Sequence, residues 1–176
     1  MKFDLRYYQE ECRDAMLAGE ADWSKQCAVL PVGSGKTIIF SSIAEAKVER
    51  REKTLILADK DNAIVAASVQ TMVNRLDKWP RNHFSTLIID EAHHCVADQW
   101  QRVLSHFDGG GTRVHGFTAT PERNDRRSIG SYFENLSYEI GLRQLIHDGY
   151  LCPIKILALP TRIDPRHASS SAAQHC

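Results

Sequence analysis

The chain has 176 residues, of which 43% are hydrophobic and 25% charged, so it is long enough for one globular domain with a proper core. Its 22 basic and 22 acidic residues balance, which excludes a global positive field for nucleic acid. No apolar run approaches a membrane span, and the start MKFDLRYYQEE lacks the apolar stretch of a signal peptide, so we expect a cytoplasmic protein. Five scattered cysteines argue against disulfides and paired zinc ligands.

Strands and helices are predicted to alternate along the chain. In order, we expect a helix over 8–19, a strand over 26–32, a helix over 36–50, strands over 54–58 and 63–68, a helix over 69–79 that Pro80 ends, a strand over 85–90, a helix over 98–107, a strand over 112–120, a helix over 141–150 and a strand over 153–163. The strands are apolar rather than alternating, which indicates an α/β fold with a parallel sheet covered on both faces. The tail over 164–176 has no periodicity and is expected to be disordered.

The segment LPVGSGKT, residues 30–37, joins a predicted strand to a predicted helix. Gly33 and Gly35 permit positive φ, so successive N–H groups can form a nest for anionic oxygens at a helix N-terminus. Lys36 would then reach the β- and γ-phosphates of a nucleotide, and the Thr37 hydroxyl would bind Mg²⁺. Leucine stands where the strict consensus has its first glycine, and an ordinary glycine-rich turn with a surface lysine is the alternative.

The segment LIIDEAHH, residues 87–94, ends an apolar strand with two acids. Ligands of parallel sheets sit at the carboxyl ends of the strands. Asp90 would hold Mg²⁺, directly or through water, and Glu91 would orient or deprotonate an attacking water. The adjacent HHC also invites a zinc interpretation, but neighbouring residues on one turn do not easily converge on one tetrahedral ion.

With GKT, DEAH and GFTATP (residues 116–121) in this order, the chain resembles the N-terminal RecA-like domain of superfamily-two helicases, above all the DEAH-type branch related to type III restriction subunits. The resemblance covers residues 3 to about 163. It implies a RecA-like three-layer sandwich around a mostly parallel sheet, an ATP-binding domain over 1–163, and ATP and Mg²⁺ as cofactors. A phosphate-loop GTPase is a weaker alternative, because DKDN does not supply the guanine-reading Asn-Lys-x-Asp motif.

The resemblance also implies roles for individual residues. LRYYQ, residues 5–9, is similar to a nucleotide motif in which Gln9 would read the adenine edge; a helix start with a core aromatic is the alternative. The TAT motif would couple nucleotide state to nucleic-acid grip, unless its threonines only form a turn after the strand. The expected catalytic residues are Lys36, Asp90, Glu91, His93, Thr118 and Thr120. The expected nucleotide-binding residues are Arg6, Tyr8, Gln9, Gly33, Ser34, Gly35, Lys36 and Thr37.

ASVQTM, residues 67–72, is similar to a family segment that touches the nucleic-acid backbone. Ser68, Gln70 and Thr71 are therefore candidate phosphate contacts, which would position a strand without reading its sequence. Helix capping by Ser68 is the alternative. Two basic groups could also touch nucleic acid, although acids are interleaved in both and a solvated face is the simpler interpretation: Arg50, Arg51 and Lys53, and Arg123, Arg126 and Arg127.

The family's second RecA-like domain carries an arginine finger, so we expect another chain to supply one, or else a truncated remnant that binds nucleotide at most. A motif that follows the LILA strand in the family is also absent, which indicates a lost crossover between Ala58 and Ala63. Only DKDN separates the two apolar runs; it reaches about 14 Å, whereas a parallel return must cover about 17 Å. We therefore expect an antiparallel hairpin that turns Ser68, Gln70 and Thr71 away from the nucleic-acid groove.

Overall fold

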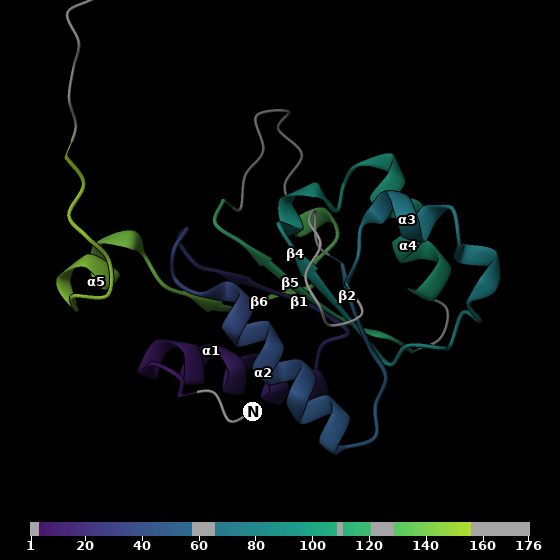
Figure 1. The fold of residues 1–176 in the computed structure, drawn as a ribbon, viewed down its shortest axis with the longest axis horizontal. Helices are drawn as coiled ribbons and strands as arrows, with labels where there is room; N and C mark the ends of the chain where they lie inside the picture. The colour runs from purple at the N-terminus through teal and green to yellow at the C-terminus, as the bar shows by residue number, and fades with distance from the viewer. Residues whose placement is uncertain (1–3, 58–65, 109–110, 121–128, 156–176) are drawn as a thin grey trace, which may run out of the picture.

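The computed structural model describes residues 4–57, 66–108, 111–120 and 129–155 (Figure 1). Six strands in these ranges form one sheet in the order β3-β2-β4-β5-β1-β6, and each of their pairings is parallel. The strands are β1 (Lys25–Val29), β2 (Thr54–Leu57), β3 (Ala66–Ala67), β4 (Thr86–Asp90), β5 (Arg113–Thr118) and β6 (Asn135–Glu139). The expected α/β class with a parallel central sheet is confirmed.

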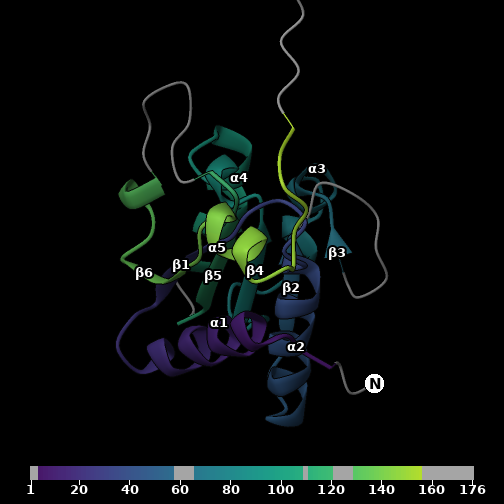
Figure 2. The ribbon, with the colours of Figure 1, turned by 90° about the vertical axis from the view of Figure 1, so that its left-hand side faces the viewer.

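Helices cover both faces of the sheet. They are α1 (Tyr7–Ala18), α2 (Lys36–Glu49), α3 (Val69–Val73), α4 (Asp98–Phe107) and α5 (Leu142–His147). Helices α1 and α2 lie on one face, and α3 and α4 lie on the other (Figures 1 and 2). The predicted helix over 69–79 is split, because α3 gives way to a short 3-10 turn, Leu76–Lys78, before Pro80. None of the described helices is long and apolar enough to cross a bilayer.

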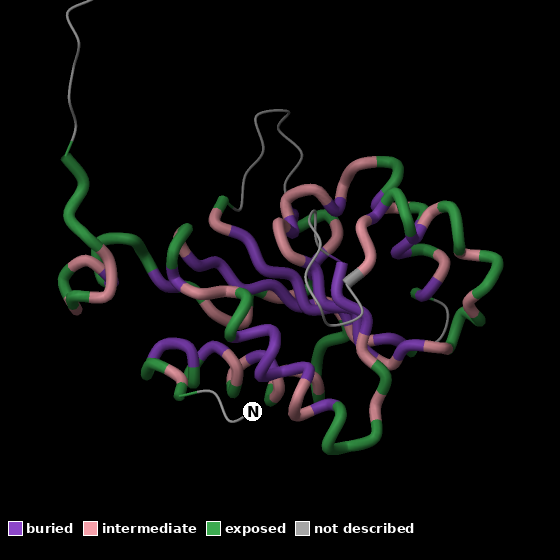
Figure 3. Tube along the Cα trace, in the orientation of Figure 1, coloured by how far each residue is buried: buried purple, intermediate pink, exposed green. Residues whose placement is uncertain are grey.

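The central strands bury side chains on both faces, which is why they read as unbroken apolar runs. In β4, Leu87 and Ile89 pack into the core under α3 and α4, while Ile88 packs into the core under α1 and α2. In β2, Leu55 and Leu57 face the first core and Ile56 the second. Figure 3 shows this buried layer running through the middle of the molecule. The two cores hold the carboxyl ends of the strands in one row.

The expected hairpin between residues 54–58 and 63–68 is wrong, because β2 and β3 are parallel neighbours, with Ile56 opposite Ala66 and Leu57 opposite Ala67. The expectation assumed two full strands joined by DKDN. Instead β3 has 2 residues, and the connection is segment 58–65, which lies outside the described residues. That segment reaches roughly 26 Å when extended, enough to return along so short a pairing. Helix α3 therefore follows a strand of the usual direction.

Strand β6 was not predicted from the sequence. Its residues, NLSYE, form the edge of the sheet beside β1, and Leu136 within it is 49% exposed. An edge strand needs little apolar surface, so neither an apolar run nor a clear alternation marks it. The predicted strand over 153–163 is not found in residues 153–155, and its remainder lies outside the described residues, as do the tail and Arg123, Arg126 and Arg127.

Candidate functional site

The candidate site residues gather along the carboxyl ends of the strands. The glycine-rich loop follows β1, Asp90 ends β4, Thr118 ends β5, and Ser68 follows β3. Because the described pairings are parallel, these positions share one edge of the sheet. Sheet order puts β5 between β1 and β4, so the loop and Asp90 are separated by two strand spacings, roughly 10 Å. The edge thus brings together residues that lie far apart in the sequence.

The glycine-rich loop depends on glycine at two positions. Gly33 has φ 82° and Gly35 has φ 79°, in the left-handed region that other residues rarely adopt. Gly35 is also the N-cap of α2, and a Cβ there would lie 2.7 Å from Gln9 Nε2. The loop therefore turns directly into the N-terminus of α2, the arrangement that favours phosphate oxygens.

The side chains of the loop suit a phosphate ligand. Lys36 is half-buried and its Nζ reaches back to the Leu30 carbonyl oxygen at 3.4 Å, a long and weak contact that a phosphate could replace. Ser34 is buried, and its hydroxyl has no hydrogen-bond partner among the described residues. A buried hydroxyl normally has a partner, and a bound phosphate oxygen would provide one. Thr37 is exposed on the first turn of α2.

The start of α1 holds the loop from behind. The Tyr8 hydroxyl donates to the Ser34 carbonyl oxygen at 2.8 Å, and Gln9 Nε2 donates to the same oxygen at 3.0 Å. Gln9 Oε1 accepts from the Arg6 backbone N–H at 3.0 Å. Tyr8 and Gln9 are both buried, whereas Arg6 is exposed. Three of the predicted nucleotide-binding residues thus contact the loop or one another, and the Gln9 amide keeps one N–H and one lone pair for a further partner.

Residues beyond α5 also reach this region, and the sequence analysis missed them. The Arg6 guanidinium lies 5.0 Å from the centre of the Tyr150 ring, and Leu151 Cδ2 would lie 3.2 Å from a Cβ at Gly33. The Tyr7 hydroxyl donates to the Asp148 carboxylate, and this hydrogen bond raises the pKa of Tyr7 to about 12. Spacing within the chain links none of these residues to the start of α1, so only the fold reveals the contact.

The acidic strand end forms a second group of contacts. The Glu91 backbone N–H donates to Asp90 Oδ1 at 3.0 Å, and Glu91 itself has φ 54°, a left-handed conformation uncommon outside glycine. His93 Nδ1 lies 3.3 Å from Glu91 Oε2 and 3.1 Å from Thr118 Oγ1. The backbone of Thr120 meets the same hydroxyl, which donates to the Thr120 carbonyl oxygen and accepts from its N–H. The fold therefore joins the DEAH and TAT segments directly.

A magnesium site here would be incomplete without its ligand. The described residues contain no group of three or more His, Cys, Asp or Glu side chains placed to hold a metal. The predicted ligands, the Thr37 hydroxyl and the Asp90 carboxylate, are two oxygens, and Mg²⁺ typically keeps waters and takes substrate phosphates alongside one or two protein oxygens. The donor set therefore fits a magnesium ion that arrives with a nucleotide.

The candidate nucleic-acid contacts lie at the start of α3. Ser68 is its N-cap, with Oγ accepting from the Thr71 N–H at 3.2 Å and lying 2.9 Å from Thr71 Oγ1. The capping interpretation of Ser68 is thus confirmed, although capping leaves room for a further contact. Thr71 and Gln70 are exposed, and because β3 is parallel to β2 they share the edge with the loop and Asp90. The expectation that these residues are turned away from the nucleic-acid groove is wrong, because it depended on the antiparallel hairpin.

The family model described as "Type III restriction enzyme, res subunit" matches residues 2–64 and 58–123. "Putative ATP-dependent helicase IRC3" of Saccharomyces cerevisiae is 30% identical over 212 aligned residues, and "Putative mitochondrial ATP-dependent helicase irc3" of Schizosaccharomyces pombe is 28% identical over 208. Both alignments cover 96% of this chain, which spans 31% and 34% of these relatives. Among solved structures, the "ATP-dependent Type ISP restriction-modification enzyme LlaBIII bound to DNA" matches 84% of this chain and 16% of its own, with a TM-score of 0.59 and 16% identity.

Proposed function

Because this chain belongs to the family of the type III restriction enzyme res subunit, with the N-terminal RecA-like fold of superfamily-two helicases, we propose that it is the Mg-ATP-binding motor domain of an ATP-dependent helicase or translocase acting on DNA. The observation that carries the proposal is the loop between β1 and α2, with two glycines at positive φ and a buried Ser34 hydroxyl that has no hydrogen-bond partner in the described part of the chain. Successive backbone N–H groups that lead into a helix N-terminus in this way are suited to bind anionic oxygens.

Each residue of the site has a proposed task. The backbone N–H groups around Ser34 hold phosphate oxygens, and Lys36 swings from the Leu30 carbonyl oxygen to the β- and γ-phosphates. Thr37 and Asp90 would hold Mg²⁺, which when bound would neutralise charge that develops on the phosphate oxygens. Glu91 orients the attacking water and accepts its proton at a carboxylate oxygen.

Coupling to nucleic acid is proposed to run through the contact between the DEAH and TAT segments. A change at Glu91 that follows the nucleotide would be felt by His93, 3.3 Å away, and by Thr118, which His93 contacts. Ser68, Gln70 and Thr71 would contact the nucleic-acid backbone from the start of α3, at the same edge of the sheet. These contacts would grip DNA without reading its sequence.

Nucleotide binding is the first test of this proposal. Lys36→Ala removes the cation aimed at the β- and γ-phosphates, and losing such a preorganised group costs about 3 kcal/mol, or roughly a hundredfold in affinity. Isothermal titration calorimetry with Mg-ATP should detect the loss, and Lys78→Ala, at an exposed lysine of the 3-10 turn after α3, serves as the matched control. Equal affinity of folded Lys36→Ala and wild type would refute the assignment of the loop.

A second candidate function is a nucleotide-binding remnant with an internal deletion. The family model matches in two pieces that meet over residues 58–64, where the sequence indicates a lost crossover. The alignment with IRC3 also runs over 212 residues, more than the 176 of this chain, so the relative contains residues without a counterpart here. The first observation supports a lost segment between β2 and β3, together with the nucleic-acid-gripping motif that it carries in the family; the second supports a loss without giving its position.

Turnover separates the two candidates. The arginine finger of the family belongs to a second RecA-like domain, and its lack costs on the order of 10³–10⁵ in rate. For either candidate we expect these 176 residues, purified alone, to hydrolyse ATP slowly with or without single-stranded DNA. A second RecA-like domain added as another chain should restore the rate of a motor domain but not that of a remnant. Brisk hydrolysis that Glu91→Gln abolishes would instead favour a self-sufficient motor.

A cytoplasmic location stays a prediction, and the S. pombe relative carries a mitochondrial name.

A further inference from the structure

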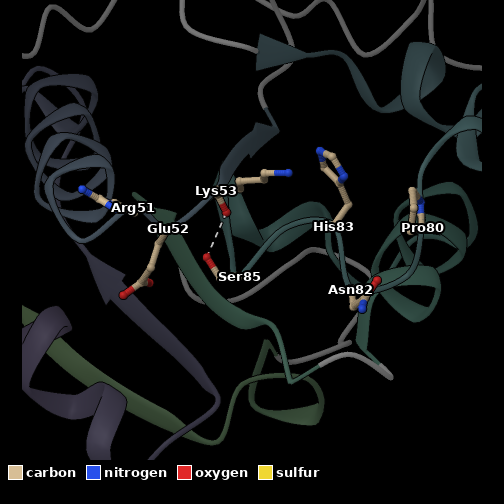
Figure 4. Close-up of a pocket in the computed structure, with 7 residues that line it drawn as sticks. All are labelled: Arg51, Glu52, Lys53, Pro80, Asn82, His83 and Ser85. Atoms are coloured by element: carbon tan, nitrogen blue, oxygen red, sulfur yellow. Dashed lines mark hydrogen bonds between the residues drawn. The ribbon is translucent and has the colours of Figure 1, made fainter.

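A recess of about 430 Å³ opens at the edge of the sheet opposite the glycine-rich loop (Figure 4). It lies between the segment that enters β2 and the segment that enters β4, two strands that pair with Thr54 opposite Thr86. The five residues of β4 separate this amino-terminal edge from Asp90 by roughly 16 Å. The residues that line it are Arg51, Glu52, Lys53, Pro80, Asn82, His83 and Ser85.

The net charge of this recess is positive, although basic and acidic residues alternate in the segment Arg51–Lys53. Glu52 is the only acid among the described residues that line it, and its carboxylate is paired at 2.9 Å with Lys47 Nζ, a buried ammonium that also contacts Glu20. Arg51 and Lys53 are exposed, and their guanidinium and ammonium groups form no ion pair or hydrogen bond with any described residue. The Glu52 carboxylate is therefore directed toward Lys47, the two bases of the lining outnumber this acid, and both bases remain available.

Two lining side chains approach one another from separate segments. Figure 4 shows the Lys53 ammonium and the His83 ring directed toward each other across the recess. The His83 ring is held by edge contacts with Trp79 and Phe84, each with ring centres 4.8 Å apart, so its position is fixed by packing. Asn82 lines the same side and adds an amide. The Ser85 hydroxyl donates to the Lys53 carbonyl oxygen at 3.0 Å and ties the two segments together.

Arg51 occupies a backbone position where glycine is favoured. Its φ is 61°, and two hydrogen bonds close the end of α2 around it, from Arg51 N–H to the Val48 carbonyl oxygen and from Glu52 N–H to the Lys47 carbonyl oxygen, each at 2.9 Å. This is the Schellman ending, whose left-handed residue is most often glycine. The left-handed backbone of arginine at that position is strained, and backbone strain of this kind is concentrated at functional sites.

We propose that the recess is a phosphate-binding site, in which the Arg51 guanidinium, the Lys53 ammonium, the His83 ring and the Asn82 amide donate hydrogen bonds to phosphate oxygens. The described lining residues offer several donors and, apart from Pro80, include no apolar residue, which suits a small, highly charged anion better than an apolar ligand. The phosphate can be a free phosphate group or a phosphate of a nucleic-acid backbone. This site is independent of the ATP site proposed at the other edge of the sheet.

Location-resolved titration of the full chain tests the proposal. Inorganic phosphate should shift the backbone amide NMR signals of residues 51–53 and 82–85 in the wild-type chain. The Arg51→Gly/Lys53→Gln variant should bind at least about tenfold more weakly at these signals, because it loses two charge-assisted contacts. Arg51→Gly relieves the left-handed arginine, so the loss cannot be attributed to unfolding if the thermal midpoint holds or rises.

Three comparisons make the outcome decisive. Arg143→Gln, at an exposed cation on α5, is the matched control and should bind phosphate at the recess like wild type. Lys36→Ala should leave the recess signals unchanged even where it abolishes ATP binding, which keeps this test apart from that of the ATP site. A single-stranded oligonucleotide that loses affinity in the double variant, with a shallower salt dependence, identifies the backbone as the source; unchanged DNA affinity identifies free phosphate. Phosphate shifts that are absent, or equal in wild type and double variant, overturn the proposal.

Discussion

His93 donates from Nδ1 to Thr118 Oγ1 at 3.1 Å, across the carboxyl ends of β4 and β5. The direction follows from the other partners of the hydroxyl, because Thr118 gives its proton to the Thr120 carbonyl oxygen. The hydroxyl oxygen is therefore an acceptor, and Nδ1 carries the proton. Thr118 is fully buried, so its orientation is held by packing, and the contact is a fixed link between the DEAH and TAT segments.

This link should be measurable as an energetic coupling. Thr118→Val and His93→Ala each remove one partner, and we expect a coupling free energy of about 0.5–1.5 kcal/mol in a double-mutant cycle of urea unfolding. Thr120→Val is the control, since only the backbone of Thr120 meets the hydroxyl, and its unfolding free energy should change by no more than about 0.5 kcal/mol. Strictly additive effects of the two substitutions would contradict the link.

Gly116 is needed for space rather than for its backbone angles. A Cβ at this position in β5 would lie 2.3 Å from Phe133 Cζ and 2.9 Å from Ala92 Cβ, next to Glu91. Gly116→Ala should therefore lower the unfolding free energy by about 1–3 kcal/mol. Gly141→Ala, where a Cβ meets nothing within 4 Å, should cost less in the same denaturation experiment, because only the preference for glycine over alanine at the N-cap of α5 opposes it. Equal stability of the two variants would show that the packing around Gly116 yields without cost.

Gln9 has two proposed tasks that nucleotide choice can separate. Its amide braces the loop through Ser34 and Arg6, and it would also read the adenine edge with its remaining N–H and lone pair. If it reads adenine, Gln9→Ala should weaken ATP more than GTP and so lower the ratio of the two affinities. Calorimetry with both nucleotides gives this ratio. If Gln9→Ala lowers the affinities for ATP and GTP by the same factor, Gln9 only supports the loop and does not read adenine.

Acid should weaken the fold through the buried contacts of Glu20. Burial alone would raise the pKa of this carboxyl, but the contacts with His115 at 3.0 Å and Lys47 at 2.5 Å outweigh it, so the pKa lies below its usual value of 4.5. Because the carboxyl has a lower pKa in the folded state than in the unfolded state, its ionisation stabilises the fold at pH values above the unfolded-state pKa. This contribution is lost as the pH falls through the folded-state pKa.

We therefore expect the urea midpoint to fall as the pH drops below about 4.5. Glu20→Gln should be less stable at neutral pH and should lose part of this acid dependence, whereas Glu139→Gln, at an exposed end of β6, should keep it. Parallel pH profiles for wild type and Glu20→Gln would rule out the proposed role of the contact.

The sequence by itself determined the elements whose signals are local. Glycines at 33 and 35 followed by Lys-Thr define a turn into a helix, because positive φ and helix initiation depend on neighbouring residues only. The apolar runs of β1, β2, β4 and β5 reveal a sheet buried on both faces, since each side chain in them needs cover. From these two patterns follow the parallel α/β fold and the row of candidate residues at one edge.

The tertiary structure alone decided how distant residues meet and which edges are paired. Strand β3 pairs parallel with β2 although the connection between them looked too short, because β3 has only 2 residues. Strand β6 joins the sheet as a half-exposed edge strand without a strong hydrophobic pattern. The Gln9–Ser34, Lys47–Glu20 and Lys53–His83 neighbours depend on the packing of α1 and α2 and on the order β2-β4, which no spacing within the chain expresses. Side-chain contacts of this kind arise only when packing brings separate segments together, so local sequence patterns carry no trace of them.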